Sequence, residues 1–215
     1  MDIARIALLA TVSLLLGVAL AAWGELLPLR PGFVAGPALV GAVLLARAYW
    51  ARRRRVILDD PISADDANSD AERKLWLHLA GNALIVGFVV RVLAEPGSEV
   101  HRSTGDTGGL DSWLMVAGAA VAWWLLRERG DRHDERDRDI AAFGDRVGYW
   151  ALVMLLLGFL LTLGFAPPGT LDRFTHWLIA NALLVLIMAA GVVQHSAQLA
   201  RYARERRLDH QDETP

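Results

Sequence analysis

The sequence predicts an all-α polytopic membrane protein with about six transmembrane helices. Hydrophobic residues make up 54% of its 215 positions, and the mean hydropathy is +0.31. These residues are gathered into long runs, and the charged residues are crowded between the runs, which is typical of a chain that crosses a bilayer several times. The stretch from Leu152 to Leu163 carries no charge on any helical face, so lipid suits it better than water.

Six apolar runs account for these helices. Most are close to the roughly 20 residues that a helix needs to cross about 30 Å of hydrocarbon. The first run also resembles a signal peptide cleaved after Ala21, but later runs repeat its pattern, so we expect an uncleaved helix. The fourth run is short and rich in Ala and Gly, a composition that lets helices approach closely in lipid. The runs are 3–22, 33–50, 75–94, 113–126, 147–165 and 174–197.

The first, third and fifth runs align with one another at a spacing of about 70 residues. Gly17, Gly87 and Gly158 fall in register, and each run is followed by a break that contains Pro. This pattern suggests a single integral membrane domain, 1–215, built from three tandem parallel helical hairpins. The hairpins are 3–50, 74–127 and 146–200, with cytoplasmic connectors 51–73 and 128–145 and a C-terminal tail, 201–215.

The cationic residues predict the orientation. If six helices alternate in direction, the clusters at 52–55, 73–74, 127–146 and 201–207 all fall on one side of the membrane. Loops rich in Arg and Lys stay in the cytoplasm, so we expect both the N- and C-termini to be cytoplasmic.

The segment that opens the third hairpin reads DERDRDIAAFGDRVGYW, and a terminal arginine cluster follows the second helix of this hairpin. In these features residues 134–207 resemble small uncharacterised bacterial membrane proteins whose helical hairpin opens with an Asp-Glu-Arg run. The sequence SDAERKLW at 69–76 repeats the pattern more weakly. The resemblance covers about a third of the chain. It implies a membrane hairpin in a bacterial cytoplasmic (inner) membrane, and it transfers no activity and no site.

Four polar residues inside the apolar runs form the candidate intramembrane site. A polar side chain in hydrocarbon costs several kcal/mol unless it has a partner, so such residues often mark function. His78 and Asn82 lie one turn apart on the third run, while Asn181 and His195 share a face of the sixth. We expect His78 and His195 near the same end of the bundle, where they can face each other.

These four residues have three interpretations. Structural packing through hydrogen bonds is the one that we favour. The second is a polar translocation path lined by all four side chains. The third is ligation of a haem iron or a metal by the two imidazoles, although no carboxylate obviously completes a metal site.

A charged segment, ERGDRHDERDRD, precedes the fifth run. Its alternating signs are typical of a solvated loop that sets topology, or of a salt-bridged helix that serves as a cytoplasmic contact surface. The candidate contact residues are Arg132, Glu135, Arg136 and Arg138. A cytoplasmic protein or a second copy of the chain is the expected partner, besides the lipid bilayer. We expect no nucleic acid, because acidic residues cancel the arginines and no aromatic residue is interleaved with them.

No catalytic constellation is visible, and we assign no catalytic residue, cofactor or metal ligand. The sequence has no HExxH, GxSxG, Walker or GxGxxG motif. It also has no cysteine, which excludes disulfides, thiolate catalysis and Cys-ligated metals. The sequence therefore favours a non-enzymatic interaction or regulatory membrane module. A small transporter or channel is the alternative, and a haem-binding electron carrier is the third hypothesis.

Overall fold

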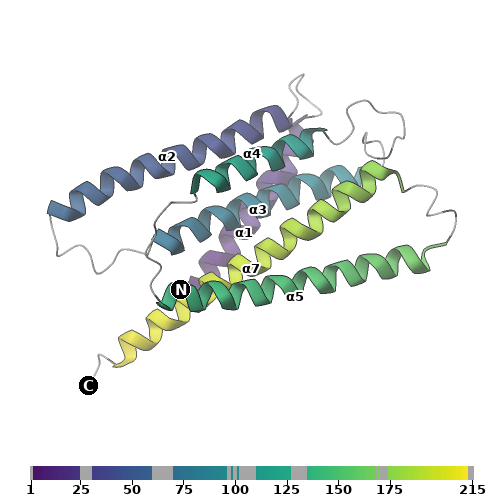
Figure 1. Ribbon diagram of the computed structural model, residues 1–215. Coiled ribbons are helices and arrows are strands. Elements are labelled where there is room, and N and C mark those ends of the chain that lie inside the picture. The colour runs from purple at the N-terminus through teal and green to yellow at the C-terminus, as the bar shows by residue number, and fades with distance from the viewer. Residues whose placement is uncertain are drawn as a thin grey trace.

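A computed structural model of the chain is all-helical, as the sequence predicts. The structure describes residues 2–24, 31–59, 70–95, 98, 101, 110–126, 135–167, 169 and 174–212, and no strand occurs among them. The helices are α1 (Asp2–Gly24), α2 (Pro31–Asp59), α3 (Asp70–Ala94), α4 (Leu110–Leu126), α5 (Glu135–Phe165) and α7 (His176–Asp212) (Figure 1). Five of these helices are long and apolar enough to cross a membrane, and α4 is a shorter apolar helix.

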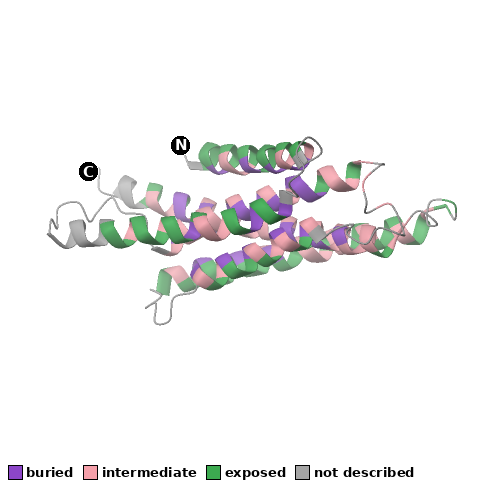
Figure 2. Cartoon of the chain, turned by 90° about the horizontal axis from the view of Figure 1, so that it is seen from above, coloured by how far each residue is buried: buried purple, intermediate pink, exposed green. Residues whose placement is uncertain are grey.

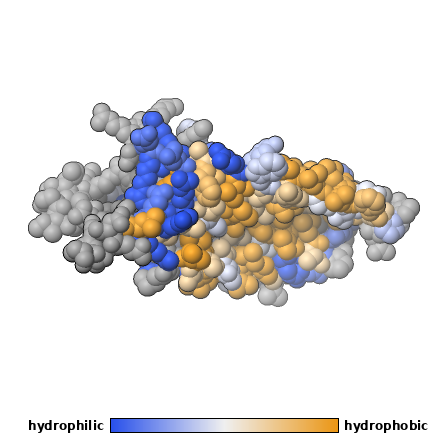
Figure 3. Space-filling model, turned by 90° about the horizontal axis from the view of Figure 1, so that it is seen from below, coloured by the Kyte–Doolittle hydropathy of each residue, from blue (hydrophilic) through white to orange (hydrophobic). Residues whose placement is uncertain are grey.

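The helices alternate in direction, so their charge-rich ends lie together. α1 runs parallel to α3, because Ile6 packs near Leu79 whereas Leu14, further along, meets Gly87. α7 runs antiparallel to both α3 and α5. On the face that Figure 3 shows, hydrophilic residues form a band toward one end, and hydrophobic residues cover much of the rest.

Two glycines allow α1 to approach α3 closely. A Cβ on Gly17 would overlap with the backbone carbonyl oxygen of Leu84, and a Cβ on Gly87 would overlap with that of Leu14. Hydrocarbon provides no hydrophobic drive between helices, so association depends on such van der Waals contact. The pairing of α1 with α3 therefore requires the absence of a side chain at both positions.

α2 and α4 form a second parallel pair of the same kind. A Cβ on Gly36 would lie 2.8 Å from the carbonyl oxygen of Leu114, and a Cβ on Gly118 would lie 2.5 Å from the backbone oxygen of Gly36. Further along the pair, Val43 and Ala122 belong to one buried cluster. Small residues in α4 thus serve helix packing, as its composition predicts.

α3 is the central helix of the bundle. Ile85, Phe88 and Val89 are at most 1% exposed. They pack in one apolar cluster with Met115 of α4 and Met188 of α7. This cluster joins α3 to α4 and α7 in the middle of the bundle.

The outer helices present apolar side chains to their surroundings. Leu8 of α1 is 65% exposed, and Leu161 and Phe165 of α5 are 57% and 83% exposed. Figure 2 shows the same for the helix that begins at the N-terminus, where exposed residues cover the outer face. Large apolar side chains at this exposure are compatible with contact to a lipid bilayer.

The helix partners differ from those that three self-contained hairpins would have. α1 packs mainly on α3, and α2 packs mainly on α4, so the first two hairpins interleave. α5 and α7 pack closely on each other. Gly17 and Gly87 lie in a helix contact, whereas nothing lies within 4 Å of a Cβ on Gly158. A threefold repeat stays a prediction.

The helices continue beyond the predicted apolar runs. α5 begins at Glu135, inside the predicted connector 128–145, and α7 continues to Asp212 through most of the predicted tail. An ion pair between neighbouring turns, Arg201 with Glu205 at 3.2 Å, supports the helix where apolar residues end. Part of what the sequence suggested as connector and tail is therefore helical.

Candidate functional site

A cleft of about 760 Å³ lies where α3, α4, α5 and α7 meet. His78 and Asn82 of α3 and His195 of α7 line it, and all three belong to the sequence-predicted site. Trp123 and Trp124 of α4 line it from another side. The cleft therefore combines intramembrane polar groups with aromatic walls, which is the usual composition of a small-molecule site.

His78 and His195 stack on each other. Their ring centroids are 5.2 Å apart and their planes are inclined by 29°. The ring of Trp123 meets that of His78 edge to face, with centroids 6.0 Å apart. The two imidazoles thus form one ring cluster that ties α3, α4 and α7 together.

This arrangement does not favour the ligation of haem or metal. Stacked rings present their faces to each other, whereas an iron bound by two imidazoles lies between nitrogen atoms. Within the described ranges, no group of three or more His, Asp or Glu side chains could hold a metal ion.

Asn82 is buried with part of its hydrogen-bonding capacity unused. The residue is 3% exposed, and its Oδ1 has no hydrogen-bond partner among the described residues. Gly191 of α7 makes room for this side chain, since a Cβ there would overlap with the Nδ2 atom of Asn82. An unsatisfied buried polar atom costs about 1–3 kcal/mol. A donor on a ligand in the cleft would remove that cost.

A chain of hydrogen bonds orients His195. Its Nδ1–H donates to Oε1 of Gln198 at 3.2 Å, and Nε2 of Gln198 donates to the backbone oxygen of Ala141 at 3.4 Å. In this orientation of the amide, the Gln198 oxygen faces the ring, which assigns the imidazole proton to Nδ1. In the neutral ring Nε2 is then a hydrogen-bond acceptor.

Asp145 of α5 is the acidic residue among the described residues that line the cleft. Nε2 of Gln194 donates to its Oδ1 at 2.8 Å. Gly148 leaves the space for this contact, because a Cβ there would lie 2.9 Å from Oε1 of Gln194. Tyr149 also lines the cleft, whereas no Lys or Arg does so in the part of the chain that the structure describes.

Asn181 lies away from the other three predicted residues. It is fully buried, and its Nδ2 donates to the backbone oxygen of Trp177 in the preceding turn at 2.9 Å. Ten positions separate it from Gly191, which is roughly 15 Å along a helix. The structure therefore brings three of the four predicted side chains to the cleft, and the apolar cluster around Phe88 lies between them and Asn181.

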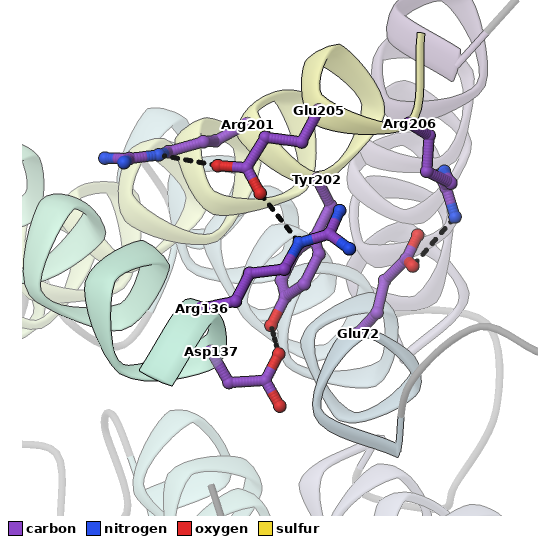
Figure 4. A network of polar contacts seen from close by, with 7 residues as sticks. All are labelled: Glu72, Arg136, Asp137, Arg201, Tyr202, Glu205 and Arg206. Carbon is purple, nitrogen blue, oxygen red and sulfur yellow. Dashed lines mark hydrogen bonds and ion pairs between the residues drawn. The ribbon is translucent and has the colours of Figure 1, made fainter. Parts of the chain in front are cut away.

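At the charged end, α5 and α7 are joined by side-chain contacts (Figure 4). The hydroxyl of Tyr202 donates to Oδ1 of Asp137 at 2.6 Å. Nε of Arg136 donates to Oε2 of Glu205 at 2.7 Å. These contacts follow the bond from Gln198 to α5 at intervals of about one turn, so the two helices are connected from the cleft to the end of the bundle.

α7 is joined to α3 at the same end. NH1 of Arg206 donates to Oε2 of Glu72 at 2.8 Å, and the Glu72 side chain is only 3% exposed (Figure 4). A carboxylate at this depth requires compensation by a charged or polar partner. The ion pair therefore fixes the last turns of α7 against the central helix.

The predicted contact residues are only partly available to a partner. Arg132 lies outside the described residues, while Glu135, Arg136 and Arg138 are exposed. Arg136 pairs with Glu205, and its guanidinium carbon lies 6.0 Å from the ring centroid of Tyr202. Arg136 thus holds α5 to α7, and Arg138 is the more suitable residue for probing an external contact.

Sequence reasoning missed Asp145, Gln194 and Gln198. The signal that could have found them is their spacing. Polar residues recur at every fourth position of α7, and the residues that they contact on α5 are also four positions apart. The facing residues are Gln194, Gln198 and Tyr202 on α7 and Asp145, Ala141 and Asp137 on α5.

The resemblance of residues 134–207 to small bacterial membrane proteins stays a prediction. No protein-family model, curated protein or solved structure matches this chain.

Proposed function

We propose that this protein is a regulatory membrane module that binds a small ligand in the cleft and transmits the occupancy of the cleft to its charged end. The observation that carries the proposal is the connection of both regions through the same two helices. His195 lines the cleft and bonds through Gln198 to Ala141 of α5. The next turns of the same helices carry the contacts of the charged end.

The charged end is the proposed output surface. We expect it to face the cytoplasm of a bacterium, since the arginine-bearing ends of α5 and α7 lie there and such segments are retained on the cytoplasmic side. A cytoplasmic protein or a second copy of the chain would bind there. Ligand binding can change the surface only by favouring one packing of α5 on α7 over another.

Cysteine labelling tests whether solutes enter the cleft. The chain has no cysteine, so each variant would carry one thiol. Ala190→Cys places it in the cleft lining, and Ala119→Cys places it in the packed apolar cluster; the two alanines are 5% and 2% exposed. We expect monobromobimane to modify the Ala190→Cys variant at least about 100-fold faster than the Ala119→Cys variant, since locally packed cores open rarely. Equal and slow rates would contradict a ligand cleft.

Hydrogen exchange tests whether the cleft is coupled to the charged end. The bimane group attached to the Ala190→Cys variant fills part of the cleft, and the same group attached through Leu161→Cys, on the exposed face of α5, is the matched control. We expect amide exchange in residues 198–208 to change severalfold only when the bimane group occupies the cleft. Unchanged exchange would leave a binding site without regulation.

A transporter is the second candidate, and the convergence of His78, Asn82 and His195 on one cleft favours it. Transport would require the polar path to continue past the apolar cluster to Asn181. Asn181→Cys distinguishes the two functions. Modification by a water-soluble thiol reagent at a rate close to that of the Ala190→Cys variant would support a continuous path, and protection would support a closed binding site.

A haem-binding electron carrier, the third hypothesis, requires His78 and His195 to leave their stack. Its test is the visible absorbance of protein purified from cells supplied with haem. A Soret band that is lost in His78→Ala and in His195→Ala would support it.

A further inference from the structure

We infer that the cleft takes a small amphipathic ammonium ion, meaning a protonated amine joined to an apolar body. This inference rests on the proposed function in one respect, namely that the cleft is a ligand site. It adds the chemical class of the ligand, which follows from the polar atoms, the aromatic walls and the charges of the lining residues.

Three residues of the cleft lining offer acceptor atoms: Asn82, His195 and Asp145. Oδ1 of Asn82 is buried without a partner among the described residues. The Gln198 bond places the proton of His195 on Nδ1, which makes Nε2 of the neutral ring an acceptor. Asp145 contributes a carboxylate, one oxygen of which receives the Gln194 amide. A ligand that satisfies these atoms must bring N–H or O–H donors.

The charge of the lining favours a cation among such donors. Asp145 is the acidic lining residue, and neither Lys nor Arg lines the described cleft, although the nearby charged end holds many arginines. Asp145 is exposed, and a carboxylate with no Lys or Arg beside it in the described lining attracts positive charge. Anionic ligands would meet no counter-charge there.

Aromatic rings supply the rest of the site. Trp123, Trp124 and Tyr149 line the cleft, and the latter two are 67% and 63% exposed. Ring faces attract organic cations by about 0.5–2 kcal/mol each, and the same rings bury apolar groups. Apolar residues such as Leu152 and Ile187 extend the lining. An ammonium group fits the ring faces and the carboxylate of this lining, and a hydrocarbon body fits its apolar residues.

Two sources can supply an ammonium group in a membrane: a free amine, or the headgroup of an aminolipid. An aminolipid also carries a phosphate, which would need an arginine or lysine that the described lining lacks. We therefore assign the cleft to a free monocationic amine that reaches it from the bilayer interface.

Charge-selective labelling tests the inference. Ala120 lines the cleft and is exposed, so Ala120→Cys adds a thiol without overpacking. Val121 is 48% exposed and does not line the cleft, so Val121→Cys is the matched control. Each variant is treated, in nonionic detergent, with three methanethiosulfonate reagents: the cationic 2-aminoethyl, the anionic 2-sulfonatoethyl and the neutral methyl compound. We expect the cation-to-anion rate ratio of the Ala120→Cys variant to exceed that of the control about tenfold.

Two further measurements test whether Asp145 causes the charge preference and whether an amine occupies the cleft. Asp145→Asn retains an oxygen that can accept the Gln194 hydrogen bond and removes only the charge, so it should lower the ratio in the Ala120→Cys background by roughly threefold or more. Hexylamine, which is protonated at pH 7 as a lysine side chain is, should protect the thiol of the Ala120→Cys variant from the neutral reagent, and hexanol at the same concentration should not.

The outcomes are distinct. If the neutral reagent modifies the Ala120→Cys variant but its charge ratio equals that of the Val121→Cys control, the cleft exists and the ammonium inference fails. If phosphatidylethanolamine added to the micelles protects the cleft thiol as well as hexylamine does, the occupant is a lipid headgroup and the assignment to a free amine fails. If the cleft thiol reacts with no reagent while the control thiol does, the proposed function fails as well.

Discussion

His78 of α3 and His195 of α7 stack with their ring centroids 5.2 Å apart, and this contact joins the central helix to the helix that carries the charged end. It lies at the cleft, one turn from Asn82 on α3 and one turn from Gly191 on α7, where the glycine admits the Asn82 amide. The pair therefore serves packing and lines the site at once, so its removal should affect both stability and ligand access.

The first prediction concerns this ring pair. His78→Ala removes contacts to both His195 and Trp123, so it should lower the free energy of unfolding in detergent, whereas His78→Phe should retain most of it. A double-mutant cycle with His195→Ala should give a coupling energy of about 0.5–1.5 kcal/mol. The exposed His176 is the control, and its change to Ala should alter stability by about 0.5 kcal/mol or less. If the effects of His78→Ala and His195→Ala on the free energy of unfolding are additive, the stack contributes nothing to stability.

The sequence was sufficient to predict this contact only in part. The period of the apolar runs and the cost of burying polar groups indicated that His78 and His195 lie near one end of the bundle. The stacking depends on the rotation of α3 and α7 about their axes, which a single sequence with apolar residues on every face does not determine. The position of Asn181, away from the cleft, was open to prediction, because fourteen positions separate it from His195, which is roughly 21 Å along one helix.

The second prediction concerns the glycines of the α1–α3 pair. Gly17→Leu and Gly87→Leu should separate the helices, because a Cβ at either position would overlap with a backbone carbonyl oxygen. We expect a loss of several degrees in the midpoint of thermal unfolding, or a failure to purify as a single species. Gly158→Leu is the matched control, since nothing lies within 4 Å of a Cβ there. An equal loss in all three variants would indicate a general sensitivity to leucine and not a helix contact.

These glycines also show where sequence reasoning fell short on the fold. The alignment of Gly17 with Gly87 suggested a repeat, and the structure places each glycine against the backbone of the other's helix, at Leu84 and Leu14. Self-contained hairpins would pair α1 with α2 and α3 with α4, whereas α1 packs mainly on α3 and α2 mainly on α4. Partner choice in lipid depends on the shape of small-residue surfaces, and those surfaces become visible only when two helices are placed together.

The third prediction concerns the ion pair between Glu72 and Arg206. Arg206→Gln leaves the 3% exposed carboxylate of Glu72 without this partner, so it should reduce the free energy of unfolding by about 1–3 kcal/mol. Arg201→Gln is the control, because Arg201 and Glu205 are 37% and 27% exposed and an exposed pair contributes about 0–1 kcal/mol. Chemical denaturation in detergent measures both variants. A larger loss for Arg201→Gln would refute the role assigned to Glu72.

The fourth prediction concerns the direction of the charged end. The single-cysteine variants Arg207→Cys and Phe165→Cys, both at exposed positions, report on opposite ends of the bundle. If the cationic end is cytoplasmic, an impermeant sulfonated thiol reagent should modify the Phe165→Cys variant in intact cells and the Arg207→Cys variant only after the membrane is opened or inverted. The reverse result would place the termini outside, and the cleft would then open toward the opposite membrane surface while its chemistry stayed the same. Modification of both variants in intact cells would show that the chain inserts in two orientations, and the charged end could not then serve as a purely cytoplasmic output surface.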